Sequence, residues 1–224
     1  MGHDNEPVPT SVRDTEKRLA ARAAAELVED GMLVGLGTGT TVAFLLPALA
    51  SRRLSIRCVA TSPHTQEAAT ALGLRVGPFN MDRLDIAIDG ADQITPEGWL
   101  VKGGGGAHTR EKLVAIAADR FVVIADSTKV VPAVHSPIPL ELIAFGVEST
   151  LARLNKARRR DVPLSPQGGI IADFLGDVED PATLAVKLEA TPGVMSHGLF
   201  PPTMVSTILV GREDSVQRTD VMGQ

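Results

Sequence analysis

The sequence has few of the residues on which disulfide-bonded and metal-dependent sites are built. Its 224 residues include one cysteine, Cys58, which excludes an internal disulfide and argues against a zinc site built on thiolates. Because Cys58 lies in the apolar run 56–60, we expect it to be a small buried side chain. No metal-ligand spacing such as H-E-x-x-H links the five histidines, so we expect no metal at His3, His64, His108, His135 and His197.

Long apolar segments and an excess of positive charge are missing as well. The longest apolar run, 42–50, is about half a membrane span and contains Pro47. Residues 1–10 lack the apolar core of a signal peptide, and we expect residues 1–12 to form a mobile tail. The net charge of −5 gives no reason to expect nucleic acid or an anionic membrane as a partner. We therefore expect a soluble cytoplasmic protein, with small molecules and other protein chains left open as partners.

Short apolar segments alternate with helical patterns through the first 130 residues. The first helix is predicted to start at Ser11, which has capping-box spacing with Asp14, and to end before Gly31. The remaining pattern predicts strands at 32–35, 56–60, 84–88 and 121–125, and helices at 42–49, 66–72 and 107–118. Such alternation predicts a parallel sheet covered on both faces, in which ligands bind beyond the carboxyl ends of the strands.

The pattern changes after about residue 135. Strands are predicted at 140–144, 170–174, 194–200 and 204–210, and helices at 147–160 and 181–190. This series indicates a small α+β second domain, whose last strand could rejoin the first sheet. We interpret the basic run Arg158–Arg160 as a solvated helix end that complements the helix dipole, with a phosphate or nucleic-acid site as the alternative.

Four consecutive glycines, Gly103–Gly106, form the most unusual stretch of the chain. Glycine loses more conformational freedom on folding than any other residue, so such a run suggests backbone close to a ligand or in positive-φ conformations. The run follows the apolar segment 99–101 and leads directly into the helix predicted at 107–118. We therefore favour a ligand-binding loop over a flexible linker.

A second glycine loop, Gly35–Thr41, has the composition of a phosphate cradle. Its glycines allow backbone N–H groups to point inward, its threonines add hydroxyl donors, and a predicted helix begins directly after it. The loop lacks the Gly-Lys-Ser/Thr ending of a P-loop and does not complete G-x-G-x-x-G. It therefore favours a small phosphate ester over a nucleotide, although a plain tight turn could have the same composition.

Charged residues follow the predicted strands and could act on such an ester. Asp89 and Asp92 follow the strand 84–88, and Lys102 and Glu111 flank the glycine run. Two or three carboxylates and an ammonium group suit proton abstraction next to a carbonyl, with Glu111 as the base and Lys102 beside the enolate. Taken singly, the aspartates could be turn or cap residues, and Glu111 an ordinary first-turn glutamate. No G-x-S-x-G motif supports acyl chemistry instead.

In order and spacing, four motifs together resemble ribose-5-phosphate isomerase of the A type. They are Gly37–Thr41, Asp89–Asp92, Lys102–Lys112 and Asp126–Lys129, and the resemblance extends from about residue 15 to residue 211. It implies interconversion of ribose 5-phosphate and ribulose 5-phosphate, without metal or organic cofactor, by a homodimer or homotetramer. The implied fold is a parallel-sheet, Rossmann-like α/β domain of residues 1–134 and 205–224, with an inserted ferredoxin-like α+β domain of residues 135–204.

The resemblance also implies roles for individual residues. Glu111 would move a proton between C2 and C1 through an enediolate, while Asp89 and Lys102 would assist at the hydroxyl and the developing oxyanion. Phosphate and sugar would be held by Thr38, Gly39, Thr40, Thr41, Gly90, Ala91, Asp92, Gly103, Gly104, Gly105 and Lys129, with Lys17 as a fainter match.

The chain departs from the family pattern at three places. Gln93 stands where the family usually has glutamate, Ser206-Thr207 replaces the usual Ala-Asp, and the segment before Ile170 is short. Two other functions share the general fold. One is a sugar-phosphate-binding sensor, although the segment before Gly31 is too short for a DNA-reading helix-turn-helix, and the other is a coenzyme A transferase-like enzyme.

Overall fold

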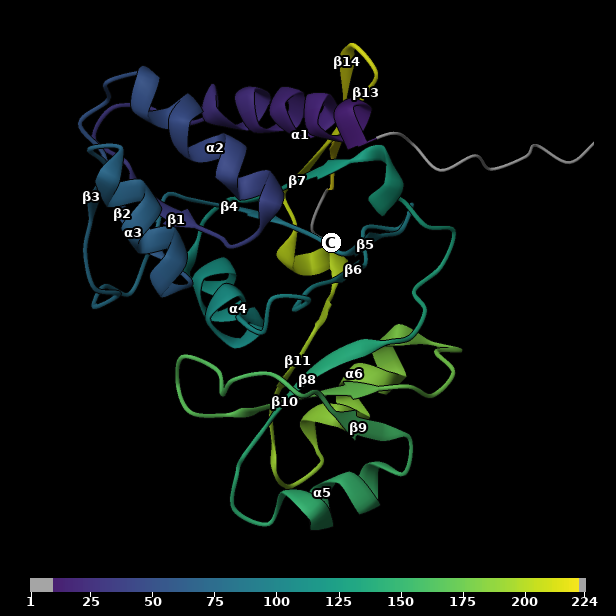
Figure 1. The fold of residues 1–224 in the computed structure, drawn as a ribbon. Coiled ribbons are helices and arrows are strands. Elements are labelled where there is room, and N and C mark those ends of the chain that lie inside the picture. The colour runs from purple at the N-terminus through teal and green to yellow at the C-terminus, as the bar shows by residue number, and fades with distance from the viewer. Residues whose placement is uncertain (1–9, 222–224) are drawn as a thin grey trace, which may run out of the picture.

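The computed structural model describes residues 10–221, and its largest element is a seven-stranded sheet of order β14-β13-β7-β4-β1-β2-β3 (Figure 1). Neighbouring strands are parallel except for the C-terminal pair β13 and β14. The strands are β1 Leu33–Leu36, β2 Arg57–Ala60, β3 Arg75–Val76, β4 Ile86–Gly90, β7 Phe121–Asp126, β13 Thr207–Arg212 and β14 Ser215–Asp220.

Helices cover both faces of this sheet. Along β7, Val122 and Ile124 face a core shared with α1 (Thr10–Ala25), α2 (Thr40–Ser51) and α3 (Pro63–Ala71), while Phe121 and Val123 face a core shared with α4 (His108–Ala117). Both sides of the strand are buried, which explains why its sequence is a continuous apolar run. α1 and α2 lie on one side of the sheet and α4 on the other (Figure 1).

Two smaller sheets complete the fold. A three-stranded sheet of order β12-β6-β5 joins Leu199–Phe200, Leu100–Val101 and Gln93–Ile94 beside the first sheet. A four-stranded antiparallel sheet of order β11-β8-β10-β9 forms the lower lobe of Figure 1. Its elements follow the βαββαβ order of a ferredoxin-like fold: β8 Ile138–Leu142, α5 Val147–Leu154, β9 Ala157–Arg159, β10 Ile170–Phe174, α6 Pro181–Glu189 and β11 Val194–His197.

The predicted fold class is confirmed, including the return of the last part of the chain to the first sheet through β13 and β7. The helix predicted at 181–190 is also present, and the Asp180 side chain accepts hydrogen bonds from the first-turn N–H groups of Ala182 and Thr183. Within residues 10–221, every helix falls short of the length and apolar character that a membrane span requires.

Several predicted elements were wrong in detail. α1 already includes Thr10, so Ser11 is inside the helix, and residues 10–12 of the expected tail are helical, whereas residues 1–9 lie outside the described part of the chain. The helix predicted at 147–160 ends at Leu154, because Asn155 takes a positive φ of 60°, and strand β9 follows. The strand predicted at 194–200 is divided between two sheets at Gly198, and that predicted at 204–210 starts at Thr207, after the 3₁₀ helix η2 (Pro202–Met204).

Candidate active site

The loops that follow the parallel strands meet around a cavity of about 380 Å³. The carboxyl ends of parallel strands share one edge of a sheet, so polar residues far apart in the sequence are brought together there. The cavity is lined by Thr38, Gly39, Thr40, Thr41, Gly90, Ala91, Asp92, Lys102, Gly103, Gly104, Gly105, Glu111 and Lys129. This lining contains every predicted site residue except Asp89, which lies below it, and Lys17.

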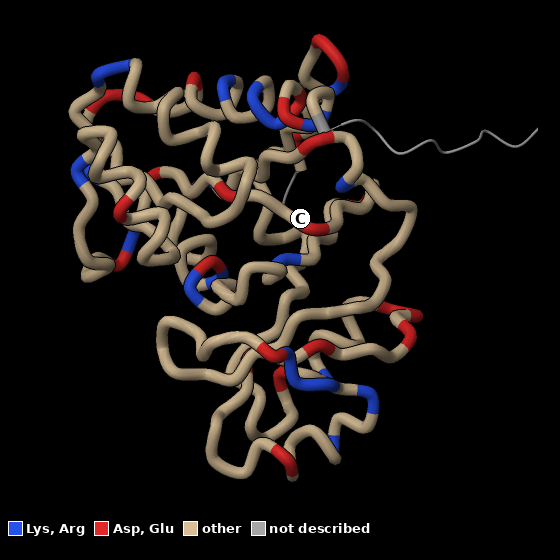
Figure 2. The backbone as a smooth tube through the Cα atoms, in the orientation of Figure 1, with Lys and Arg blue, Asp and Glu red and all other residues tan. Residues whose placement is uncertain are grey.

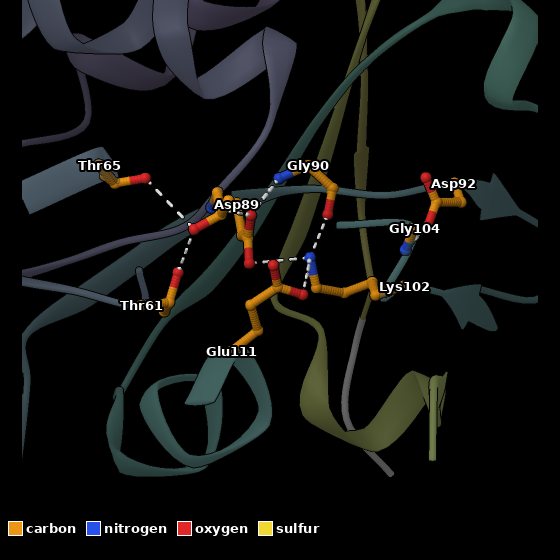
Figure 3. A network of polar contacts seen from close by, with 9 residues as sticks. Thr61, Thr65, Asp89, Gly90, Asp92, Lys102, Gly104 and Glu111 are labelled. Atoms are coloured by element: carbon orange, nitrogen blue, oxygen red, sulfur yellow. Dashed lines mark hydrogen bonds and ion pairs between the residues drawn. The ribbon is translucent and has the colours of Figure 1, made fainter. Parts of the chain in front are cut away.

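Lys102 lies between two carboxylates at the base of the cavity (Figure 3). Its Nζ is 2.8 Å from Asp89 Oδ2 and 3.2 Å from Glu111 Oε2, and it also donates to the carbonyl oxygen of Gly90. The three charged side chains are almost fully buried, with 2%, 4% and 5% of their surfaces exposed for Lys102, Asp89 and Glu111. Glu111 Oε2 has this ionic contact but no partner with hydrogen-bond geometry.

The second oxygen of Asp89 is fixed by backbone donors. Asp89 Oδ1 accepts from the N–H groups of Thr38, at 3.0 Å, and Gly90, at 2.7 Å. A Cβ atom at Gly37 would overlap the Asp89 carboxyl group, which explains the glycine at that position. The first glycine loop therefore packs directly on Asp89 and holds it in place.

The burial of these groups changes their affinities for protons. Burial, and then the negative charge of Asp89, raise the pKa of Glu111 to about 8, although the Lys102 ammonium opposes the shift. Burial also raises the pKa of Asp89. For Lys102, burial opposes the charged form, but the carboxylates of Asp89 and Glu111 outweigh it and raise the pKa. Glu111 can consequently exchange a proton near neutral pH, as an acid–base catalyst must.

The other side of the cavity has the features of a phosphate site. α2 begins at Thr40, and its N-cap residue, Gly39, provides no side-chain cap, so the positive end of the helix dipole faces the cavity lining. Lys129, from the 3₁₀ helix η1 (Ser127–Lys129), adds a positive charge. The Thr38 N–H is directed to Asp89, and its hydroxyl lies 2.8 Å from that of Thr61, so Thr38 also supports the loop itself.

Lys17 is the predicted site residue that the structure places elsewhere. Its Nζ lies 3.7 Å from Asp14 and 4.0 Å from Asp126, beside rather than in the cavity lining. The residue is on α1, whereas the lining comes from the strand ends, the loops that follow them, and the helices α2, α4 and η1.

The glycine run is constrained by its neighbours as well as by the cavity. Gly103 has a φ of 108°, and a Cβ there would lie 2.7 Å from His108 Nδ1 and 2.8 Å from Pro139 Cβ. The N–H of Gly104 donates to Asp92 Oδ2 at 2.8 Å. A Cβ at Gly105, in contrast, would have no other atom within 4 Å. The run thus combines positions required by packing with one that is open.

Arg160 is a site-related residue that the sequence interpretation missed. Instead of ending a helix, it follows strand β9, where Nη1 donates to the carbonyl oxygens of Gly103, at 3.0 Å, and Gly104, at 3.1 Å. Its guanidinium group is held by Asp173 in a two-point salt bridge. The basic run is evident in the sequence, but the helix predicted at 147–160 was too long. It placed Arg160 at a solvated helix end instead of beside the glycine run.

Gln93, the departure closest to the site, does not line the cavity. Its Nε2 donates to the carbonyl oxygen of His135 at 2.7 Å, and its Oε1 accepts from the N–H of His135 at 2.9 Å. An amide can form both bonds, because it carries a donor and an acceptor. The changed residue therefore fastens the segment before β8 and adds no charge to the cavity lining. Within residues 10–221, no three His, Cys, Asp or Glu side chains are grouped closely enough to hold a metal ion.

Comparisons with known proteins give one family over most of the chain. Residues 57–215 match the family model of ribose 5-phosphate isomerase A (phosphoriboisomerase A). A ribose-5-phosphate isomerase A from Natronomonas pharaonis is 41% identical over 220 residues, covering 91% of this chain and 96% of that protein. One from Caulobacter vibrioides is 42% identical over 222 residues, covering 92% of this chain and 97% of that protein.

Solved structures give the same result. A ribose 5 phosphate isomerase A from Neisseria gonorrhoeae superposes with a TM-score of 0.89 at 30% identity, over 94% of this chain and 98% of that chain. A D-ribose-5-phosphate isomerase in complex with phospho-erythronic acid gives 0.88 at 28% identity, over 93% and 99%. A second family model, the DeoR C terminal sensor domain, matches residues 12–76, a minor part of the chain. By the extent and identity of these matches, the chain belongs to the ribose 5-phosphate isomerase A family.

Proposed function

We propose that this protein interconverts D-ribose 5-phosphate and D-ribulose 5-phosphate in the 380 Å³ cavity, with Glu111 as the catalytic base. The observation that carries the proposal is the position of Lys102 between Asp89 and Glu111, opposite a helix N-terminus suited to phosphate. One end of the cavity can thus hold the phosphate while the other moves protons.

Proton transfer proceeds in two parts. The ionised Glu111 carboxylate removes the proton from C2 of the open-chain aldose, and the electrons move into the C1 carbonyl to form an enediolate. The Lys102 ammonium stabilises the negative oxygen that develops. Glu111 then delivers its proton to C1, while the hydroxyl proton on O2 moves to O1 with the help of Asp89 and Lys102. The product is the ketose, and every group of the protein returns to its starting state.

The same side chains suit ring opening, which must precede the isomerisation of a cyclic sugar. Asp89 is hydrogen-bonded on both oxygens and lies 2.8 Å from Lys102 Nζ, so a proton can pass between the sugar and this pair. The phosphate group is held by the first turn of α2 and by Lys129, and the sugar hydroxyls by Asp92 and Gly103–Gly105. In this proposal Lys17 binds the phosphate by leaving its contact with Asp14 and moving towards the cavity.

Three further expectations accompany this function. Residues 135–204 act as a separate small domain, an assignment supported by the apolar core that its strands and helices share. The protein works in the cytoplasm as a homodimer or homotetramer, as the family resemblance implies. Light scattering of the purified protein measures the number of chains directly.

A sensor function would require ligand binding without a catalytic base. The partial match to a sensor domain covers residues 12–76, which include the first glycine loop but none of Asp89, Lys102 and Glu111. A buried glutamate whose pKa is raised to about 8 would be of no use to simple binding. The isomerase is therefore the function that uses every charged group of the cavity.

The test follows ketose formation from ribose 5-phosphate by protein that has been treated with EDTA. We expect turnover by the parent and a loss of about 10³-fold or more in Glu111→Gln, since the amide keeps the shape of the side chain but cannot accept the proton. Glu67→Gln, on α3, is a control for the change of charge alone. No turnover by the parent, or parent-like turnover in Glu111→Gln, would overturn the proposal.

A further inference from the structure

Arg160 links the small antiparallel sheet to the cavity. The basic segment after α5 lies in the lower lobe, with acidic positions beside it (Figure 2). From the end of β9, Arg160 Nη1 reaches the carbonyl oxygens of Gly103 and Gly104, in the loop that lines the cavity. The Arg160 side chain is 19% exposed, and the other nitrogens of its guanidinium group are bound by both oxygens of Asp173 at 2.7 and 2.6 Å.

These contacts, together with a turn bond from the N–H of Gly106 to the Gly103 carbonyl at 3.1 Å, determine the direction of two successive peptide groups. In a trans peptide, the C=O and the following N–H point in opposite directions. Because the carbonyls of Gly103 and Gly104 converge on one nitrogen atom, the N–H groups of Gly104 and Gly105 both point away from Arg160. The Gly104 N–H donates to Asp92, a residue of the cavity lining, which shows this direction. The N–H of Gly105 belongs to the same lining.

We infer that Arg160 is a positioning residue of the isomerase: it turns the Gly103 and Gly104 carbonyls out of the cavity, so that the Gly105 N–H serves as a donor to the reacting end of the sugar. This inference rests on the function proposed above and assigns a catalytic contribution to the small sheet. Successive N–H groups on one side of a loop form a concave site for negatively charged oxygen, as an enediolate requires. Without Arg160, the Gly103 carbonyl would keep its turn bond from the Gly106 N–H, but the peptide between Gly104 and Gly105 could rotate and present its carbonyl oxygen to the same oxyanion.

Asp173 holds the guanidinium group of Arg160 in place. Its two-point salt bridge fixes the plane of the guanidinium group and leaves Nη1 for the carbonyls. A lysine at position 160 could neutralise Asp173 but could not hold the carboxylate at two points and both carbonyls at once. The structure thus predicts graded effects of substitutions at these two positions.

The experiment compares Arg160→Met, Arg160→Lys and Asp173→Asn with Arg159→Met, a change of an exposed arginine at the last residue of β9. Each variant is measured for thermal midpoint, for kcat and KM with ribose 5-phosphate, and for binding of two probes by calorimetry. Phospho-erythronic acid has a carboxylate where the enediolate would form, whereas inorganic phosphate can occupy only the phosphate end. A purely structural role of Arg160 would alter the thermal midpoint and the active fraction, but not the ratio of the two affinities.

We expect Arg160→Met to lower kcat/KM by about 10- to 100-fold. The affinity for phospho-erythronic acid should fall by a similar factor, whereas the affinity for inorganic phosphate should change little. Arg160→Lys should lie between this variant and the parent, and Arg159→Met should match the parent. Asp173→Asn separates positioning from charge. If Arg160 acted only through its charge, loss of the negative charge of Asp173 would strengthen the binding of an anion. If Arg160 positions the glycine peptides, the same substitution loosens it and weakens the binding of phospho-erythronic acid.

Parent-like kcat/KM and probe affinity in folded Arg160→Met would overturn the inference, as would tighter binding of phospho-erythronic acid by Asp173→Asn. If Arg160→Met does not fold, Arg160→Lys and Asp173→Asn provide the same comparison. Absence of turnover in the parent would count against the proposed function instead, and the ratio of the two probe affinities would still decide the role of Arg160.

Discussion

At the scale of single residues, the site depends on one buried ammonium group placed between two buried carboxylates. Lys102 can neutralise only one of them at a time, so the other retains a raised affinity for protons. Asp89 has two backbone donors in addition to Lys102, whereas Glu111 Oε2 has no hydrogen-bond partner. Of these two carboxylates, Glu111 is the one that lines the cavity, where it can exchange a proton with a bound substrate.

This arrangement predicts a rise of activity with pH. The pKa of Glu111 is raised to about 8, so below that pH the free enzyme carries a protonated Glu111 that cannot accept a proton from C2. We expect kcat/KM to increase through pH 7 and to level off above pH 8, apart from a limb near pH 6 that belongs to the phosphate of the substrate. A profile that stays flat between pH 7 and 9 would contradict the assignment.

Asp89→Asn provides a matched test of the cause. The negative charge of Asp89 raises the pKa of Glu111, and its removal also leaves Lys102 to pair with Glu111 alone. Both changes favour the ionised form of Glu111. The pH limb of the residual activity should therefore move to lower pH, even though the rate falls. A limb that remains in place would mean that burial alone determines the pKa.

Lys102→Met tests the stabilisation of the oxyanion. Methionine keeps much of the volume of the buried stem but removes the charge that opposes a developing enediolate. We expect kcat to fall about 10²- to 10³-fold while KM changes much less, because the interaction is strongest in the transition state. Steady-state kinetics measured across pH give both values and separate this loss from the further rise in the pKa of Glu111 that removal of the Lys102 ammonium causes. A change confined to KM would instead make Lys102 a substrate-binding residue.

At the scale of loops and secondary-structure elements, the glycines of the run 103–106 have different functions, which single substitutions can separate. Gly103→Ala would place a methyl group within 2.8 Å of His108 and Pro139 at a φ of 108°, so we expect a loss of about 1–3 kcal/mol in stability. Gly105→Ala meets open space, so its stability should match the parent while its methyl group raises KM. Urea unfolding and kinetics on the two variants test this contrast. Equal destabilisation by both substitutions would refute it.

The sequence predicted the elements that build the site better than those that hold it in place. Strand ends such as Asp89 could be found because β4 is a continuous apolar run and β-sheet topology gathers the polar residues that follow such runs. Arg160 could not, since its role depends on the end of α5 at Asn155 and on pairing with Asp173 across two strands. The role of Gln93 could not be predicted either, because it depends on a hydrogen bond to His135, 42 residues away. Local patterns define strands and loops, whereas contacts between distant segments appear only in the folded chain.

At the scale of the whole molecule, one buried carboxylate joins the two ends of the described chain to the cavity. Glu16, on α1, is 2% exposed. Its Oε2 accepts from the N–H and hydroxyl groups of Ser127, at 2.9 and 2.7 Å, and its Oε1 accepts from the N–H of Glu213, at 3.1 Å. Ser127 begins the 3₁₀ helix that carries Lys129 into the cavity lining. Stability and substrate affinity should therefore be coupled through Glu16.

Glu16→Gln tests this coupling, because an amide cannot accept at both ends and its NH₂ group must face the N–H of Ser127 or of Glu213. We expect the free energy of unfolding to fall by about 1–3 kcal/mol and KM for ribose 5-phosphate to rise as Lys129 becomes less well placed. Glu26→Gln is the control, since its side chain is 73% exposed and its contact with Arg52 is a surface ion pair of little energy. Urea unfolding and kinetics measure both effects. A loss of stability without a change in KM would restrict Glu16 to the fold, whereas parent-like values of both would show that its three hydrogen bonds can be replaced.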